Sequence, residues 1–164
     1  MALPFYADGL RFSCARCSAC CRGGPGYVFL SKDDLRRLLV SLSLDFPSFY
    51  RRYCTLVDTG VGYSLSLAEK KNYDCVFWDQ GGCAVYEDRP VQCSTFPFWS
   101  SILVSRESWL EAARDCPGIG KGELRAREYI EELLWRRRAA GTILLDAESA
   151  RKPENIDANT ILGR

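Results

Sequence analysis

Four cysteines fall within eight residues near the start of the chain, in the order Cys-x-x-Cys-x-x-Cys-Cys. They are Cys14, Cys17, Cys20 and Cys21. Two thiolates separated by two residues can bind one metal ion, and closing so short a chelate loop costs little chain entropy. Free cysteine can also be a small buried hydrophobe, but four at this spacing are far more typical of ligands. The motif therefore predicts a thiolate metal site.

Histidine is absent from the sequence. Its absence excludes zinc fingers with two cysteines and two histidines, zinc hydrolases with histidine ligands, and proteases that use a cysteine–histidine pair or a serine–histidine–aspartate triad. Soft thiolates favour zinc, cuprous copper or iron–sulfur clusters over magnesium and calcium. The chemistry to be expected of this chain is that of sulfur-bound metals.

Composition is that of an ordinary globular domain, with 164 residues of which 47% are hydrophobic and 26% charged. A net charge of +1 gives no support to a nucleic-acid partner. No apolar run is long enough to span a membrane, and the first residues lack the features of a signal peptide. We therefore expect a cytoplasmic protein, where disulfides are disfavoured; nine cysteines would also leave one unpaired.

Helices and strands must position these cysteines. Apolar residues at helical spacing predict helices over residues 32–42, with Ser31 as the N-cap, over 47–53 and over 123–140. Residues 60–69 alternate between apolar and small or polar side chains, which is typical of a half-buried strand. Helices and strands are both expected, and the strands are short.

The remaining cysteines lie in the middle of the chain. Two β-prone runs that carry Cys75 and Cys83 surround a Gly-Gly turn, which predicts a β-hairpin. A short helix can begin at Pro90 and would carry Cys93. Residues 100–113 are expected to be extended.

Together these elements predict a small α+β domain, with a short antiparallel sheet and several helices around a cysteine metal site. The domain is expected to cover residues 1–146. Residues 147–164 are polar and weakly patterned, so we expect a loosely ordered C-terminal tail.

Several motifs in combination carry a resemblance to a known family. After the cysteine-rich motif come Cys75-Val76-Phe77, the run from Gly82 to Cys93, Phe96-Pro97, and the run from Cys116 to Gly122. The combination resembles the YkgJ family of cysteine-cluster proteins, a zinc- or iron-chelating domain that is also found in flagellin lysine-N-methylases. The resemblance covers residues 12–122 and implies a metal-chelating domain.

The sequence departs from the family pattern at two positions. Ser94 follows Cys93 where members often have a basic residue, so no role is carried over to that position. Cys54 lies outside every motif, and we expect it to be a buried bystander.

Eight cysteines remain as candidate ligands once Cys54 is set aside. They are Cys14, Cys17, Cys20, Cys21, Cys75, Cys83, Cys93 and Cys116. Eight thiolates can form two tetrahedral zinc sites, or one iron–sulfur cluster with ligands to spare. The number of candidate ligands is a multiple of four, which favours tetrahedral zinc sites. The spacing of the first three, with a remote Cys-Pro ligand, echoes ferredoxins and favours iron. Zinc and iron both remain open.

The order of these ligands favours one shared site over two independent modules. Side chains of adjacent residues usually diverge, so we expect either Cys20 or Cys21 to point to a second site or into the core. The group from Cys75 to Cys116 is too spread out to converge without a folded scaffold. Sharing ligands between the two groups would couple metal binding to folding.

Three hypotheses for function follow. The first is a metal-binding domain whose thiolate site organises the fold and serves zinc or iron handling. The second is an iron–sulfur redox or radical-type enzyme related to the flagellin lysine-N-methylase domains. The third is a structural zinc module for protein interaction. A metal ion is the expected partner, and no feature of the sequence identifies a protein partner.

Overall fold

The structure, a computed structural model, describes residues 3–163 and confirms an α+β fold. The helices are α1 (Lys32–Leu42), α2 (Phe46–Tyr53), α3 (Val91–Ser94), α4 (Arg106–Asp115), α5 (Arg127–Ala140) and α6 (Ala158–Leu162). The strands are β1 (Leu10–Phe12), β2 (Val28–Phe29), β3 (Cys54–Asp58), β4 (Tyr63–Leu67), β5 (Trp78–Asp79), β6 (Gly82–Cys83), β7 (Ile119–Arg125) and β8 (Leu144–Leu145). Short 3-10 turns are η1 (Ala19–Cys21), η2 (Ser149–Arg151) and η3 (Pro153–Asn155). No helix within residues 3–163 has both the length and the apolar character needed to cross a bilayer.

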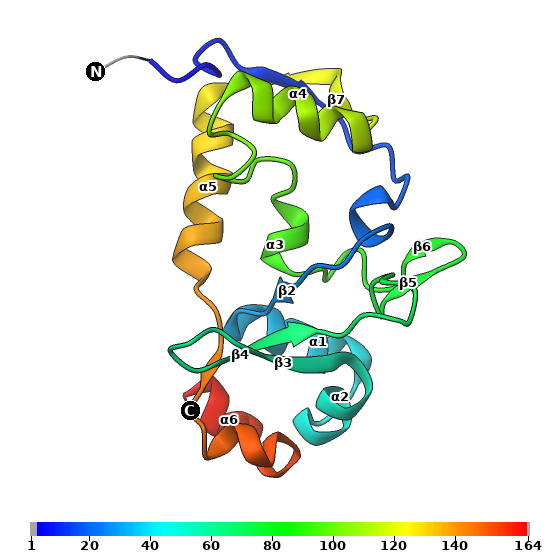
Figure 1. Cartoon of the computed structure of the whole chain (residues 1–164), viewed down its shortest axis with the longest axis vertical. Helices are drawn as coiled ribbons and strands as arrows, with labels where there is room; N and C mark the ends of the chain where they lie inside the picture. The colour runs from blue at the N-terminus through cyan, green and yellow to red at the C-terminus, as the bar shows by residue number, and fades with distance from the viewer. Residues whose placement is uncertain (1–2, 164) are drawn as a thin grey trace.

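The molecule is elongated, with β1, β7 and α4 at one end and the larger sheet at the other (Figure 1). Helix α5 runs along one side from the first end towards the second. Helix α3, turn η1 and the β5–β6 hairpin lie between the two ends (Figure 1). Each end has its own cluster of buried hydrophobic side chains.

At one end, a four-stranded antiparallel sheet has the order β2-β4-β3, with β8 also pairing to β4. Strand β4 is central, so the side chains of Ser64 and Ser66 are buried as well as those of Leu65 and Leu67. Because it is covered on both faces, the alternation in the sequence marks a fully buried strand rather than a half-buried one.

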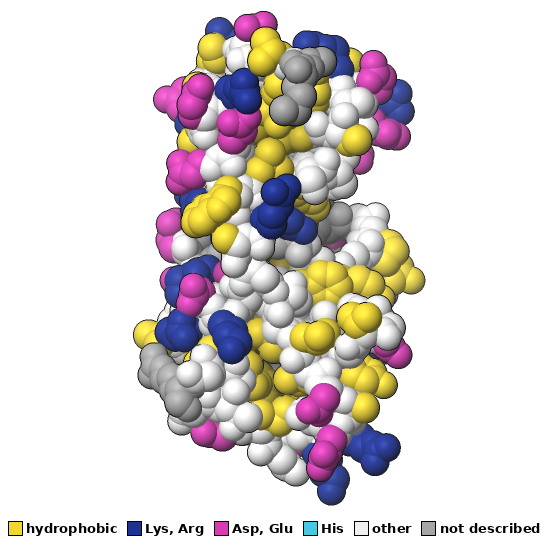
Figure 2. All heavy atoms as spheres, turned by 90° about the vertical axis from the view of Figure 1, so that its left-hand side faces the viewer, with side chains coloured by type: hydrophobic (Ala, Val, Ile, Leu, Met, Phe, Trp, Pro, Cys, Tyr) yellow, Lys and Arg dark blue, Asp and Glu magenta, His cyan; other side chains and the backbone are white. Residues whose placement is uncertain are grey.

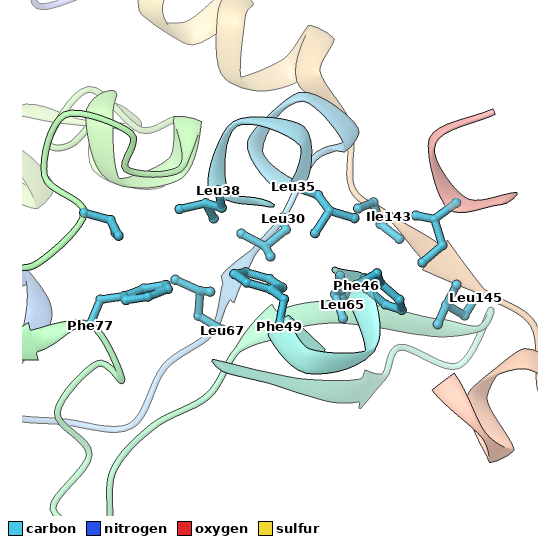
Figure 3. Close-up of a cluster of buried hydrophobic side chains, with 12 residues drawn as sticks. Leu30, Leu35, Leu38, Phe46, Phe49, Leu65, Leu67, Phe77, Ile143 and Leu145 are labelled. Carbon is cyan, nitrogen blue, oxygen red and sulfur yellow. The ribbon is translucent and has the colours of Figure 1, made fainter. Parts of the chain in front are cut away.

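Helices α1 and α2 cover this sheet and complete the sheet core, in which their side chains point towards those of β4 (Figure 3). Its buried members are Leu30, Leu35, Leu38, Phe46, Phe49, Leu65, Leu67, Phe77, Val85, Ile143, Leu145 and Ile161. Helix α1 matches the predicted bounds because Ser31 and Asp34 form a capping box at its start. Helix α2 is also confirmed, and Asp45 caps it.

At the other end, β1 and β7 form a two-stranded antiparallel ribbon against which α4 and α5 pack. The buried members of this ribbon core are Leu10, Phe98, Leu103, Trp109, Ile119, Ile130 and Leu133. The rings of Phe98 and Trp109 stack with their centroids 5.7 Å apart, and Phe12 meets Phe98 edge-on at 5.6 Å. Aromatic contacts of this kind stabilise a core by about 0.5–1.5 kcal/mol each beyond area burial.

Helix α4 corrects the expectation that residues 100–113 are extended. Ser105 caps the helix by accepting a hydrogen bond from the Ser108 amide. One face buries Trp109, and Leu110 on another face is 60% exposed. The apolar residues of this segment therefore do not all face the core. For this reason their spacing in the sequence did not show the period of a helix.

Two further differences lie in the C-terminal part. Helix α5 begins at Arg127 rather than 123, because residues 123–125 continue β7 and pair with β1. The segment after 146, expected to be a loose tail, contains η2, η3 and α6, and Ile161 is buried in the sheet core. Isolated apolar residues in very short helices gave no periodic signal.

Candidate metal centre

The cysteine-rich segment, residues 14–21, lies between the two cores. Strand β1 precedes it in the ribbon and β2 follows it in the sheet, so the segment crosses from one end of the molecule to the other (Figure 1). At its last turn, the Cys75 amide donates a hydrogen bond to the Cys21 carbonyl at 2.8 Å. This bond joins the N-terminal cysteines directly to the segment that carries the hairpin.

Two arginines attach the segment to aromatic rings near the hairpin. The Arg22 guanidinium lies 4.1 Å from the Trp78 ring centroid, and that of Arg16 lies 4.2 Å from the Tyr86 centroid. Cation–π contacts at exposed sites contribute about 0.5–1 kcal/mol each. The rings flank Cys83 in sequence, so the contacts hold the two cysteine groups together.

The adjacent cysteines Cys20 and Cys21 have their sulfur atoms 4.0 Å apart. Two sulfurs bound to one tetrahedral zinc at about 2.3 Å lie about 3.8 Å apart, so the pair has nearly the spacing of two ligands of one ion. The expectation that these side chains diverge is wrong. The 3-10 turn η1, which follows Ser18 in the left-handed conformation, brings the two sulfurs together.

Hydrogen bonding between these two thiols separates their proton affinities. The pKa of Cys20 is lowered to about 7, chiefly by the hydrogen bond with the Cys21 thiol; burial opposes this shift, whereas a hydrogen bond from the Cys20 backbone amide and the charge of Arg89 support it. The same pairing, together with burial, raises the pKa of Cys21. One thiol of the pair is thus prepared to ionise near neutral pH while the other holds its proton.

Three further cysteines, Cys75 and Cys83 in the segment that carries the hairpin and Cys93 in α3, interact electrostatically with this pair. Burial raises the pKa of Cys93, and negative charge at Cys75, Cys20 and Cys83 raises it further. Burial is also the main reason that the pKa values of Cys75 and Cys83 are raised. Cys20, Cys21, Cys75, Cys83 and Cys93 thus influence one another's ionisation, and we call this group the thiol cluster.

Helix α3 holds Cys93 in place through its two preceding residues. The Val91 amide donates a hydrogen bond at 2.9 Å to the fully buried carboxylate of Asp34 in α1. The Gln92 side chain accepts a hydrogen bond from the Phe29 amide at 3.2 Å, which ties α3 to β2. Helix α1 and strand β2 thus fix the position of the Cys93 thiol, although both lie far from Cys93 in the sequence.

Cys116 reaches the region from the opposite side, since it follows α4 and packs against the ribbon core. Burial raises its pKa, hydrogen bonds from the Gly118 and Ile119 amides lower it, and negative charge at Cys17 or Cys20 raises it. Cys20 acts on Cys116 and on members of the thiol cluster alike. It is the link between the two groups of cysteines.

Two glycines after Cys116, one just before β7 and one within it, allow close passage of the chain. A Cβ atom at Gly118 would lie 2.3 Å from the Ser13 carbonyl oxygen, and one at Gly122 would lie 2.3 Å from the Ser13 Cβ. Gly122 also has a φ of +72°, which side-chain-bearing residues rarely adopt. The glycines therefore seat the residue before Cys14 against β7.

Cys14 and Cys54 are not part of the thiol cluster. Cys14 is exposed, as are Cys17 and Cys20, and no hydrogen bond joins it to another cysteine among residues 3–163. Cys54 begins β3, packs against the sheet core, and has a pKa raised by burial alone. Cys54 is thus placed as the sequence predicts for a bystander.

The donor chemistry fits a thiolate-bound metal, because the clustered side chains are all sulfur. Within residues 3–163, no three histidine, cysteine, aspartate or glutamate side chains are arranged closely enough to hold an ion. The cysteines of the thiol cluster lie in one region, but their sulfur atoms do not form a closed coordination site. Zinc and iron are both compatible with such a donor set.

A surface cleft of about 510 Å³ lies beside α3, between α1 and α5, and contains no cysteine. Its lining includes Ser94, Arg89, Trp135 and Arg136. The side of the molecule that carries α5 shows basic and acidic side chains interspersed, without one sign prevailing (Figure 2). The cleft and the thiol cluster are therefore separate features.

The roles of several supporting residues could not be inferred from the sequence, although Gln92, Gly118 and Gly122 lie within the family motifs. Asp34, Gln92, Gly118 and Gly122 act on cysteines or their neighbours through contacts between distant parts of the chain. For Asp34, the local signal was the capping box that it forms with Ser31. It indicated a helix start and nothing about α3.

Fold and site together define a small cysteine-rich α+β protein whose thiols are collected between two cores. Residues 13–117 match the family model described as "CxxCxxCC: Putative zinc- or iron-chelating domain", and the chain belongs to this family. The match confirms the resemblance inferred from the motifs and supports a metal ion as partner. No solved structure matches the chain.

Proposed function

We propose that this protein is a metal-binding domain in which cysteine thiolates hold zinc or iron between the two cores, so that the metal organises the fold and serves metal handling. The thiol cluster carries the proposal. Its members come from η1, the hairpin segment and α3, and such a convergence of thiols from separate segments is typical of ligands rather than of packing.

Ligand roles follow from position. The thiol cluster supplies the central donors, and Cys17 and Cys116 form a neighbouring pair that Cys20 links to it. Cys14 remains a proposed ligand on the strength of its motif. When bound, the metal supplies a multivalent positive charge that these thiols share, and binding releases their protons. Since burial raises most of these pKa values, acid pH should weaken binding.

Purification under anaerobic conditions, with metal analysis and a visible spectrum, tests the proposal and separates the metals. Zinc protein is colourless because the zinc d shell is filled, whereas an iron–sulfur cluster gives a brown protein with broad visible absorbance. Brown protein would favour the iron–sulfur redox or radical-type chemistry, and colourless zinc protein would favour a structural or zinc-handling role. Protein that binds neither zinc nor iron would refute the proposal.

Two cysteine variants test the ligand set with a matched control. Cys83 and Cys54 are both half-buried and both pack against the sheet core. Cys83→Ser should lose most of the bound metal and unfold at a lower temperature, because a ligand is removed. Cys54→Ser should keep its metal. Full metal content in Cys83→Ser, or loss of metal from Cys54→Ser, would contradict the proposed ligands.

An excised peptide tests whether the two cysteine groups form one site. The peptide covering residues 12–26 contains the four N-terminal cysteines but lacks the other members of the thiol cluster. We expect it to bind the metal poorly compared with the whole domain. A peptide that binds as tightly would refute the shared site.

We further propose a reducing compartment such as the cytoplasm. All nine cysteines are free thiols in the structure. Thiols at this density persist as metal ligands where disulfides are disfavoured.

A further inference from the structure

Arg137 on α5 is half-buried, and one nitrogen of its guanidinium is buried without a hydrogen-bonding partner in the described part of the chain. Among residues 3–163, nothing accepts a hydrogen bond from its Nη1 atom, and that atom is buried. A buried charged donor left unpaired destabilises a protein more than a neutral one. Arg137 also lies outside residues 13–117, which match the family model. A negative charge near the buried nitrogen would therefore stabilise the folded protein.

The guanidinium is held on a rigid platform that leads to Cys93. Its Cζ atom lies 4.6 Å from the centroid of the Trp99 ring. The Trp99 indole N–H donates a hydrogen bond at 2.9 Å to the carbonyl of Gln92, the residue before Cys93. Helices α3 and α5 pack against each other at this point. Arg137 is thus fixed beside the segment that carries a central thiol.

Cys93 directly follows Gln92, so a thiol-bearing residue lies in the segment to which Trp99 ties the guanidinium. Burial lowers the pKa of Arg137, and negative charge at Cys93 opposes that shift. Arg137 has no carboxylate within ion-pair distance in the part of the chain that the structure describes. Cys93 is therefore the anionic group positioned to offset it.

We propose that Arg137 is the counter-charge of the metal centre: its partly buried guanidinium offsets the negative charge that the thiol cluster acquires when it binds metal. The inference rests on the proposed function. Cysteines bind metals as thiolates, so four of them around a divalent ion carry a net negative charge. Arg137 does not touch the metal; it acts through Cys93 as a positioning residue. Without metal its burial is unfavourable, and with metal it is compensated.

Arg137→Gln tests this role, with Arg138→Gln as the control because Arg138 is exposed on the same helix. Zinc chloride is titrated into reduced, metal-free full-length protein against a chromophoric chelator, and the titration is repeated with ferrous iron under anaerobic conditions. Arg137→Gln should weaken binding about 10–100-fold, the usual effect of losing a group that supports metal ligands. Arg138→Gln should bind as the wild type does.

Thermal unfolding distinguishes a counter-charge from a packing residue by sign. Metal-free Arg137→Gln should unfold at the same temperature as metal-free wild type or higher, since a buried unpaired charge has been removed. Metal-loaded Arg137→Gln should unfold below loaded wild type. Equal losses in both states, with unchanged affinity, would show that Arg137 serves packing alone and would overturn the inference.

A double-mutant cycle and a conservative variant complete the test. In a Cys93→Ser background, Arg137→Gln should have little further effect on affinity; an undiminished effect would contradict action through Cys93. Arg137→Lys keeps the charge but not the planar stack on Trp99, and it also serves if the glutamine variant does not fold. Affinity within about threefold of wild type supports the inference, and a loss of tenfold or more overturns it.

Failure of the inference is distinguishable from failure of the proposed function. If the wild type and Cys54→Ser bind metal and Arg137→Gln binds equally well, the inference fails and the metal-binding function stands. If the wild type binds neither zinc nor iron, the proposed function fails, and the inference fails with it.

Discussion

The two cores of this molecule differ in their number of strands and in how many of their side chains are fully buried. The sheet core has four strands, two well-capped helices and several fully buried side chains, among them Phe46 and Phe49. The ribbon core has two strands, and of its hydrophobic members Phe98 and Ile130 are the ones that are fully buried. A two-stranded ribbon is marginal by itself. The comparison indicates that the ribbon core depends on its attachment to the rest of the molecule.

That attachment runs through two places. Helix α5 contributes Ile130 and Leu133 to the ribbon core and carries Arg137 beside α3. The cysteines form the other connection, since Cys116 packs on the ribbon core while Cys75 packs on the sheet core. On the proposed function, a metal bound between them contributes most to the weaker core.

Removal of the metal should have the largest effect and an unequal one. Stripping it with a chelator under reducing conditions should destabilise the fold by several kcal/mol, as expected when metal binding is coupled to folding. Amide hydrogen exchange should rise strongly in β7 and α4 and much less in β4. Equal increases at both ends would contradict the idea that the ribbon core depends on the centre.

Truncation of one aromatic side chain in each core tests whether metal binding depends on the ribbon core more than on the sheet core. Phe98→Ala and Phe49→Ala should each lower the free energy of unfolding by about 3–5 kcal/mol, measured by denaturant titration, because both side chains are fully buried. Phe98→Ala should also reduce metal content, since Phe98 packs on Phe12 near the cysteine-rich segment. Reduced metal content in Phe49→Ala alone would reverse the assignment.

A pair of glycines gives the smallest and most local effect. Gly120 and Gly122 both have positive φ, but a Cβ at Gly120 meets nothing within 4 Å, whereas one at Gly122 meets Ser13. Gly120→Ala should cost about 1 kcal/mol through backbone strain alone. Gly122→Ala should cost about 1 kcal/mol more and weaken metal binding, because Ser13 precedes Cys14. Identical behaviour of the two variants in unfolding and metal titration would show that the approach to Ser13 does not matter.

Local signals in the sequence were sufficient for part of the sheet core, namely α1, α2 and β4, whereas β3, β8 and Ile161 were not predicted. A capped amphipathic helix such as α1 depends on neighbouring residues and was predicted correctly; the hairpin around the Gly-Gly turn is also present, but its strands are shorter than predicted and leave out Cys75. Residues 123–125 were predicted as helix but belong to β7, because pairing with β1 overrides their local preference. Helix α4 was missed because its buried face is narrow, with Trp109 buried and Leu110 exposed.

For the site, the sequence provided the residue types and the structure added their grouping. The spacing of the motif indicated sulfur-bound metal without indicating which cysteines meet. Proximity of Cys20 to Cys83 and Cys93 depends on the path of the chain between the cores. The close pair Cys20 and Cys21 depends on the conformation of a single turn. Neither follows from residue spacing alone.

Pairing of β1 with β7 also means that the first strand of the ribbon waits for its partner during synthesis. The Arg125 side chain donates a hydrogen bond to the Phe12 carbonyl, 113 residues earlier in the chain. At roughly 5–20 residues per second, the first strand and the thiols that follow it are made roughly 6–20 s before their partner strand. During that interval the nascent chain displays a row of unshielded sulfurs. On the proposed function, these thiols have to stay reduced until translation has passed the last strand of the ribbon.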